Sequence, residues 1–191
     1  MTQSFQQHTA DSYDKVAKSY ASKFYNEMDH KPFDRMMLAL LHERTADIGT
    51  ICDLGCGPGQ IAAYLQQIGA EVCGIDLSSQ LVAEARRFHP TIRFEQGDML
   101  NLHDVESEAF GGIAAFYCII HIPRAQVVDA LRELKRVLRT GGSLLLTFHI
   151  GSEVRHVDTW MDESVNVDFV FFEIEEMKGY LQAAGFHLTE V

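Results

Sequence analysis

The sequence predicts a doubly wound α/β fold with a mainly parallel, Rossmann-like sheet that is preceded by helices. Strand-like apolar runs alternate with amphipathic helical patterns, as in chains of βαβ units. Several of these runs are apolar throughout, which is typical of parallel strands covered on both faces. A glycine-rich segment, "DLGCGPG" at 53–59, joins the first such run to a helical pattern. The 191 residues suit one domain.

The first 47 residues predict a helical cap. Tyr13, Val16 and Tyr20 recur at helical spacing from about residue 9, and a second helical run follows Pro32.

Residues 48–150 predict the core of the fold, in which strands and helices alternate. The expected strands are 50–54, 71–76, 92–96, 112–120 and 142–150, and the expected helices are 60–68, 79–88 and 124–138. Residues 151–172 show no clear period and are predicted to be an irregular cap insertion. A helix at about 173–184 and a strand, "FHLTEV" at 186–191, complete the single domain of residues 1–191.

Composition and charge exclude several classes of protein. No apolar run approaches the ~20 residues that span a bilayer, and the first residues do not resemble a signal peptide, so we expect a cytoplasmic protein. The net charge is −11, and the last 41 residues hold nine acids against two cations. Such a surface repels polyanions, which argues against nucleic acid and anionic membranes as partners.

The positions of the cysteines predict that they pack in the core rather than form a redox pair or bind a metal. Cys52, Cys56, Cys73 and Cys118 all lie in or beside apolar runs, where a free thiol behaves as a small hydrophobe. Their spacing matches neither a redox pair nor a zinc site. We expect no disulfide and no metal.

The glycine-rich segment predicts a ligand site. Glycines between a strand and a helix allow a sharp turn and a close approach of the ligand to the backbone. Ligands of such sheets bind beyond the carboxyl ends of the strands. The spacing Gly55-x-Gly57-x-Gly59 departs from the dinucleotide fingerprint, because Gln60 stands where a third glycine is needed.

Five stretches together resemble the class I S-adenosylmethionine-dependent methyltransferases of the small-molecule, methyltransferase-11-like type. They are "DLGCGPG" (53–59), "GIDLS" with Asp76, "GDML" (97–100), "FYCIIHIPR" (116–124) and "LRELKRVLRTGGSLLLTFH" (131–149). The resemblance covers nearly the whole chain. It implies transfer of the methyl group of S-adenosyl-L-methionine to an O, N or C atom of a small molecule.

The resemblance also assigns cofactor-binding residues. It places Asp53 near the methionyl ammonium, Asp76 with Leu77 at the ribose diol, and Asp98 with Met99 and Leu100 at the adenine. The loop of Gly55, Cys56, Gly57 and Gly59 would form the floor, and Phe116 and Tyr117 would lie near the sulfonium. Each position has a structural alternative, namely a helix cap, an Asx turn or core packing. Period-two alternation should send at most one of Phe116 and Tyr117 to the site.

Catalysis is expected to depend mainly on positioning, because methyl transfer is an in-line displacement. If the acceptor is protonated, a base is needed, and His121 is the first candidate, followed by His149. Tyr13, Tyr20, Trp160 and Phe172 are expected to cover the crevice and to contact the acceptor together with His149. Ordinary packing is the alternative for each of them.

Two other functions share these residues. A nicotinamide-dependent oxidoreductase has the same strand, glycine loop and distal acid, although Gln60 argues against it. A non-catalytic module that binds S-adenosylmethionine would retain every cofactor residue.

The sequence departs from the pattern of this family in one respect. The family's sheet ends with an antiparallel strand between strands five and six, but the sequence stops at Val191, where strand six is expected. We therefore expect the final strand to be missing and favour truncation. A neighbouring chain could pair with the exposed edge instead, so both a monomer and a homodimer remain open.

Overall fold

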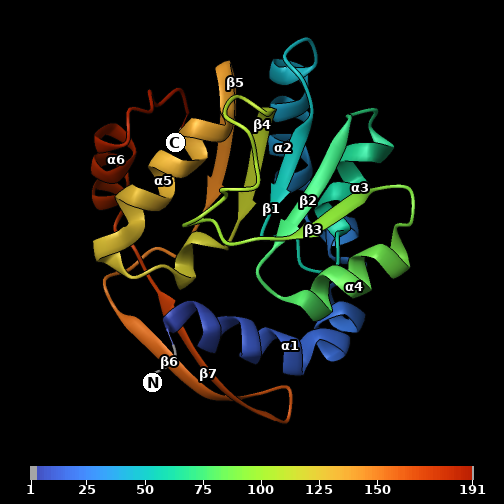
Figure 1. Ribbon diagram of the computed structural model, residues 1–191, viewed down its shortest axis with the longest axis vertical. Coiled ribbons are helices and arrows are strands. Elements are labelled where there is room, and N and C mark those ends of the chain that lie inside the picture. The colour runs from blue at the N-terminus through green and yellow to red at the C-terminus, as the bar shows by residue number, and fades with distance from the viewer. Residues whose placement is uncertain (1–3, 191) are drawn as a thin grey trace.

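The computed structural model describes residues 4–190 and contains a five-stranded sheet whose strands all run parallel (Figure 1). The strands are β1 (Ile51–Leu54), β2 (Val72–Asp76), β3 (Arg93–Gln96), β4 (Phe110–Phe116) and β5 (Leu138–Thr147). Their order is β3-β2-β1-β4-β5. The chain thus reverses direction across the sheet between β1 and β4, where ligands of such sheets bind. The doubly wound prediction is confirmed.

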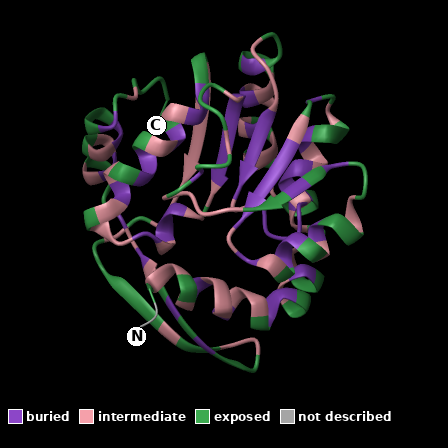
Figure 2. Ribbon diagram, viewed as in Figure 1, coloured by how far each residue is buried: buried purple, intermediate pink, exposed green. Residues whose placement is uncertain are grey.

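Helices cover both faces of the sheet, and alternating side chains of β1 explain why. Ile51 packs with α2 (Pro32–Thr45) and α3 (Gln60–Gln67). Cys52 and Leu54 point to the opposite face and pack with α5 (Val127–Val137) and α6 (Ile174–Ala183). The central strands are therefore buried on both sides (Figure 2), as their continuous apolar runs predicted.

The two N-terminal helices occupy different positions relative to the sheet. α1 (Phe5–Phe24) begins after its cap Ser4 and lies across the carboxyl ends of the strands (Figure 1). A short 3₁₀ turn, η1 (Glu27–His30), leads to α2, which packs against the sheet. α4 (Ser79–Phe88) lies beside the β3 edge of the sheet and packs with α3 around Phe94.

The prediction that 151–172 is irregular is wrong. This segment forms an antiparallel hairpin of β6 (Val154–Trp160) and β7 (Glu163–Val170). The turn at Met161 and Asp162 has φ values of 51° and 66°, which a sequence without glycine or asparagine does not indicate. The period-two signal is confined to Val165 and Val167, which are buried against α1.

The strands predicted at 112–120, 142–150 and 186–191 also differ from the structure, and the second of them, β5, begins at Leu138 and ends at Thr147. β4 ends at Phe116 rather than at residue 120, because Tyr117 takes a φ of 51° and a 3₁₀ turn, η2 (Ile119–His121), follows. Another 3₁₀ turn, η3 (Arg124–Gln126), then leads into α5. Residues 186–190 form no strand; Arg44 of α2 instead pairs with Glu190 at 2.7 Å. Val191 lies outside the described residues.

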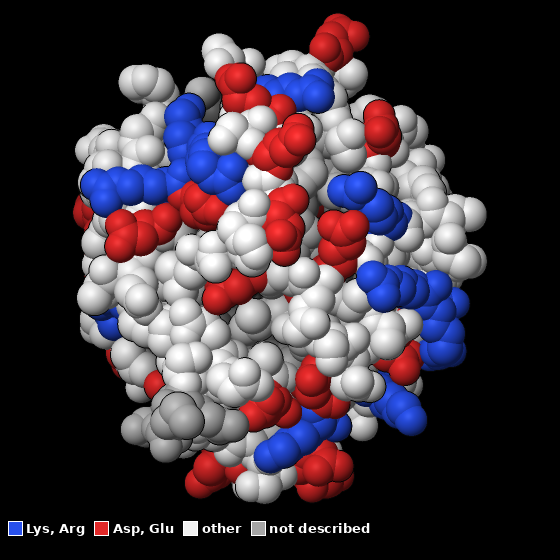
Figure 3. Space-filling model, in the orientation of Figure 1, with Lys and Arg blue, Asp and Glu red and all other residues white. Residues whose placement is uncertain are grey.

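The remaining general predictions concern charge, cysteines and membranes. Figure 3 shows acidic and basic side chains interspersed on one face of the molecule. All four cysteines are free thiols. Within residues 4–190, no helix combines the length and apolarity needed to cross a bilayer, and no cluster of ligands suited to a metal is found there.

Candidate functional site

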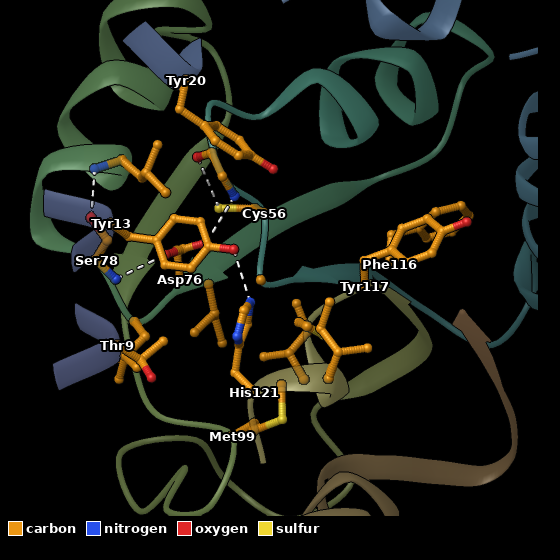
Figure 4. Close-up of a pocket in the computed structure, with 18 of the residues that line it drawn as sticks. Thr9, Tyr13, Tyr20, Cys56, Asp76, Ser78, Met99, Phe116, Tyr117 and His121 are labelled. Carbon is orange, nitrogen blue, oxygen red and sulfur yellow. Dashed lines mark hydrogen bonds between the residues drawn. The ribbon is translucent and has the colours of Figure 1, made fainter. Parts of the chain in front are cut away.

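A cavity of about 370 Å³ lies beyond the carboxyl ends of the strands. One side, here called the floor, consists of the glycine loop 55–59, the end of β2 at Asp76 and the loop after β3 at Asp98. The other side, here called the lid, consists of α1 and the β6–β7 hairpin. Figure 4 shows lid residues such as Tyr13 and Tyr20 facing Asp76 and His121. The volume is within the range of about 300–1,000 Å³ that is typical of small-molecule sites.

The glycines of the loop serve different purposes. A Cβ on Gly55 would lie 2.4 Å from the Cβ of Cys118, and a Cβ on Gly59 would lie 2.8 Å from Phe94. Packing therefore requires these two glycines. Gly57 differs, because the nearest atom to its Cβ would be in Tyr20 at 3.6 Å, across the cavity. Only Gly57 of the three leaves its bare side open toward a ligand.

Asp76 lies at the end of β2, and its carboxylate is held by the floor itself. Its two oxygens accept hydrogen bonds from the backbone N–H groups of Gly57 and Ser78, both at 2.8 Å. Burial raises the pKa of Asp76 to about 6, although these two hydrogen bonds act in the opposite direction. The helix cap of α4 is Ser78, not Asp76, because the Ser78 hydroxyl accepts from the Leu81 N–H. Asp76 thus has lone pairs left for a ligand.

Asp53 is fully buried and does not line the cavity. Its Oδ2 accepts from the N–H of Ala62 at 3.0 Å, whereas its Oδ1 has no partner among the described residues. Burial raises the pKa of this carboxyl to about 8. A contact with a ligand would therefore have to pass through an intermediary such as water.

The loop after β3 lines the cavity with Asp98 and Met99, and Leu77 lies nearby after β2. Asp98 Oδ1 accepts from the Leu100 N–H at 2.9 Å, so Asp98 also has a structural role, as the first residue of an Asx turn. Leu100 turns away and packs against the main core.

Phe116 and Tyr117 both line the cavity, contrary to the expectation from alternation. The positive φ of Tyr117 breaks the pleat, and its N–H donates to the Thr147 hydroxyl at 3.0 Å. Tyr117 then packs on His149, with 4.9 Å between ring centroids. His149 follows β5 and also lines the cavity.

His121 is bound at both ring nitrogens. Its Nδ1 is 3.0 Å from the backbone oxygen of Asp168 on β7, which can only accept, so Nδ1 carries the proton. Nε2 is consequently an acceptor and receives the hydroxyl proton of Tyr13 at 2.8 Å (Figure 4). Burial lowers the pKa of His121 to about 4. His121 therefore joins both parts of the lid to the sheet edge.

Aromatic rings line the inner surface of the lid. Tyr13 and Tyr20 each meet Trp160 edge to face, at 5.3 and 5.6 Å between centroids. Phe169 of β7 extends this group. Phe172 does not take part: it is fully buried and packs with Phe148 and Tyr180 beneath the hairpin.

Polar contacts join the two parts of the lid and tie α1 to the floor. The Ser12 hydroxyl accepts from the Asn166 N–H at 2.9 Å, and Lys15 donates to the backbone oxygen of Ser164. Asp14 accepts from the Ser78 hydroxyl and from the Gln80 N–H at the start of α4.

Most of the residues predicted for the site are thus brought together around one cavity. Those that line it are Gly55, Cys56, Gly57, Asp76, Leu77, Asp98, Met99, Phe116, Tyr117, His121, His149, Tyr13, Tyr20 and Trp160. Asp53, Gly59, Leu100 and Phe172 do not line it.

Sequence reasoning missed several lining residues. Phe24 and Glu27 belong to the first helical run, and Lys31 precedes Pro32, but nothing in their spacing marked them. Gln60 is the most informative, since its buried Oε1 has no partner among the described residues. Because Gln60 replaces the third glycine of the dinucleotide fingerprint, the sequence could have indicated an amide that faces the ligand.

Comparisons with known proteins show similarity to methyltransferases. A family model described as a methyltransferase domain matches residues 51–142. The chain is 32% identical over 144 residues to a malonyl-[acyl-carrier protein] O-methyltransferase of Enterobacter lignolyticus, which covers 74% of this chain and 53% of the relative. It is 42% identical over 59 residues to a trans-aconitate 2-methyltransferase of Escherichia coli, or 30% of this chain and 23% of that one.

Solved structures show the same fold at low identity. The complex of DhpI with S-adenosylhomocysteine superposes with a TM-score of 0.75 at 21% identity, covering 97% of this chain and 89% of the other. A 1,6-didemethyltoxoflavin-N1-methyltransferase of Burkholderia thailandensis gives 0.69 at 19% identity, covering 100% and 83%. In sequence and in fold, the chain is thus similar to S-adenosylmethionine-dependent methyltransferases. It spans about half the length of the first of these curated relatives.

Proposed function

We propose that this chain transfers the methyl group of S-adenosylmethionine to an O, N or C atom of a small molecule, and that residues 1–191 act together as one domain. The observation that carries the proposal is the Asp76 carboxylate, which is fixed by two backbone N–H groups and lines a cavity of about 370 Å³. When bound, S-adenosylmethionine supplies a methyl group on a positively charged sulfur.

The residues present fit the parts of this donor. Asp76 offers acceptor lone pairs for a ribose diol. Leu77 and Met99 offer apolar sides for an adenine, with the Asp98 carboxylate beside them. At the other end of the floor, the open side of Gly57 and the unpaired Oε1 of Gln60 suit a methionyl ammonium group. Asp53 would act behind this floor, through water.

The cavity also favours a cationic donor over a dinucleotide. Its lining residues include the acids Glu27, Asp34, Asp76 and Asp98 and, within residues 4–190, a single lysine, Lys31. Such a lining attracts a sulfonium and an ammonium, whereas a pyrophosphate would be repelled. The similarity to methyltransferases also weighs against the nicotinamide alternative.

Calorimetry with S-adenosylhomocysteine and with NADH tests the donor. We expect saturable binding of the first and none of the second; the reverse result would contradict the proposal. A labelled-methyl transfer screen over small molecules then separates an enzyme from a module that only binds the donor. The names of the relatives point to malonyl and trans-aconitate groups as acceptors of those proteins, and such acids belong in the screen.

A further inference from the structure

The two histidines that line the cavity differ in the hydrogen bonding of their ring nitrogens. His121 uses both ring nitrogens in hydrogen bonds to Tyr13 and to the Asp168 backbone. Neither nitrogen of His149 is hydrogen-bonded to any residue of the described chain, and neither is sealed from solvent as a buried unpaired atom would be. His149 is instead held by its ring faces, between Tyr117 at 4.9 Å and Phe171 at 5.0 Å. It is thus rigidly placed with free nitrogens.

The strand order assigns His149 to the acceptor's side of the cavity. The floor residues proposed for the donor follow β1, β2 and β3, which are consecutive in the sheet. The ends of β4 and β5, which carry Tyr117 and His149, lie beyond β1 on the opposite side. A donor that occupies the first three strand ends leaves these last two for the acceptor.

The charges of the cavity disfavour an anionic acceptor. Lys31, the single lysine of the described lining, is 3.7 Å from Glu27 and so is already paired. Arg155 lies over the ring of Phe171 and 3.5 Å from Glu153, and it does not line the cavity. Without a guanidinium fork, a carboxylate acceptor has no bidentate partner there. The rings of Tyr13, Tyr117, Trp160 and Phe169 instead offer flat apolar surface.

We propose that the acceptor is an uncharged aromatic molecule bearing a hydroxyl or a ring N–H, and that His149 accepts the proton of that group. This inference rests on the proposed function. The acceptor's oxygen or nitrogen forms a bond to the methyl carbon while the carbon–sulfur bond breaks, its electron pair staying on sulfur. The acceptor's proton passes to a ring nitrogen of His149. Burial, and to a lesser degree Arg155, lowers the pKa of His149, which keeps the free imidazole neutral at pH 7.

A binding experiment separates the two charge classes without requiring turnover. Protein saturated with S-adenosylhomocysteine is titrated by calorimetry with 2-naphthol and with 2-naphthoate, which share a ring system. We expect 2-naphthol to bind at least about tenfold more tightly than 2-naphthoate, because the described lining offers no unpaired cation to bind the carboxylate. Equal or tighter binding of 2-naphthoate overturns the substrate class, and loss of that preference in Arg155→Gln would locate the carboxylate partner.

A kinetic experiment tests the role of His149. Methyl transfer to a panel of phenols and N–H heteroaromatics is measured for the wild type, His149→Phe and His103→Gln. His149→Phe keeps the ring stack but removes both nitrogens, so we expect kcat to fall by about 10²–10⁴-fold with little change in S-adenosylhomocysteine affinity. His103 is an exposed histidine paired with Asp104, and its variant should match the wild type.

Each outcome bears on one claim only. Undiminished transfer by His149→Phe, or no transfer to any phenol or N–H compound by protein that binds S-adenosylhomocysteine, overturns this inference and leaves the donor site standing. A wild-type protein that does not bind S-adenosylhomocysteine overturns the proposed function itself.

Discussion

The floor and the lid of the cavity are held in place by different kinds of contact. Floor contacts are made largely by backbone groups close in sequence, such as the Ser78 N–H bound to Asp76 two residues earlier and the Gly57 N–H nineteen residues away. Lid contacts each use a side chain of α1 and join segments far apart in sequence: the Tyr13 hydroxyl to the His121 ring over 108 positions, and the Ser12 hydroxyl to the Asn166 backbone N–H over 154. The floor is therefore built into the sheet, whereas the lid forms only when distant segments dock.

The two regions also respond to pH in opposite directions. The floor contains Asp76 and the adjoining Asp53, whose pKa values are raised by burial, so ionisation of either carboxyl destabilises the folded state. In the lid contact, burial lowers the pKa of His121, so protonation of that imidazole is destabilising. Lowering the pH should therefore weaken the lid contact, whereas raising the pH through the carboxyl pKa values should weaken the floor.

Gly55 and Gly57 give the largest expected contrast within the floor. In Gly55→Ala the new methyl group collides with Cys118, so we expect a loss of about 2–4 kcal/mol in the free energy of unfolding from overpacking and a left-handed backbone together. Gly57→Ala meets no such neighbour and should lose only about 1–2 kcal/mol. Urea unfolding measures both. Equal losses would show that backbone strain alone, not packing, requires Gly55.

Asp76→Ala tests the ligand role of the floor. Loss of a charged acceptor should weaken S-adenosylhomocysteine binding by about 1.5–3 kcal/mol, or about 10- to 150-fold. Calorimetry measures the change, and Asp129→Ala, an exposed acid on α5, is the matched control. Unaltered affinity in Asp76→Ala would remove this carboxylate from the proposed ribose contact.

The buried Asp53 should make stability depend on pH. Its pKa of about 8 in the folded state exceeds the ordinary value of 3.8, so between these values the folded protein holds a proton that the unfolded chain has released. Stability therefore falls as pH rises, by up to about 1.4 kcal/mol per pH unit. The difference in unfolding free energy between wild type and Asp53→Asn should change by about this amount from pH 6.5 to 7.5. A constant difference would place the carboxyl in a wetter environment.

The smallest expected effect belongs to the lid. Tyr13→Phe removes the proton donor to His121 Nε2, which should cost about 1 kcal/mol. Hydrogen exchange should show faster opening of α1 and the hairpin with the floor unchanged. Tyr25→Phe is the control, because the Tyr25 hydroxyl makes no hydrogen bond to the described part of the chain. Uniform loss of protection across floor and lid would refute the division into two regions.

Much of the floor could be predicted because its signals are local. A strand, three glycines and a helix start fix the loop, and an acid at the end of the next parallel strand reaches the same sheet edge. Asp53 shows the limit of this reasoning. Its position after Cys52 is equally local, yet only packing decides that it lies beneath the cavity rather than in it.

The lid could be predicted only in outline. Tyr13, Tyr20 and Trp160 were expected over the crevice, but the hairpin that carries Trp160 was predicted to be irregular. Phe172 was expected there too, and it instead fills the core beneath the hairpin. His121 looked like the free base, yet its neighbours from α1 and β7 occupy both nitrogens, which no spacing in the sequence reveals.

The sequence by itself determined the class of fold and the residues at the sheet's carboxyl edge, because apolar periodicity and glycine positions act over a few residues. Only the tertiary structure decided which of those residues face the cavity, which histidine keeps free nitrogens and which carboxyl is sealed from water. These properties depend on burial and on partners more than a hundred positions away, and they arise only when α1 and the hairpin close over the sheet.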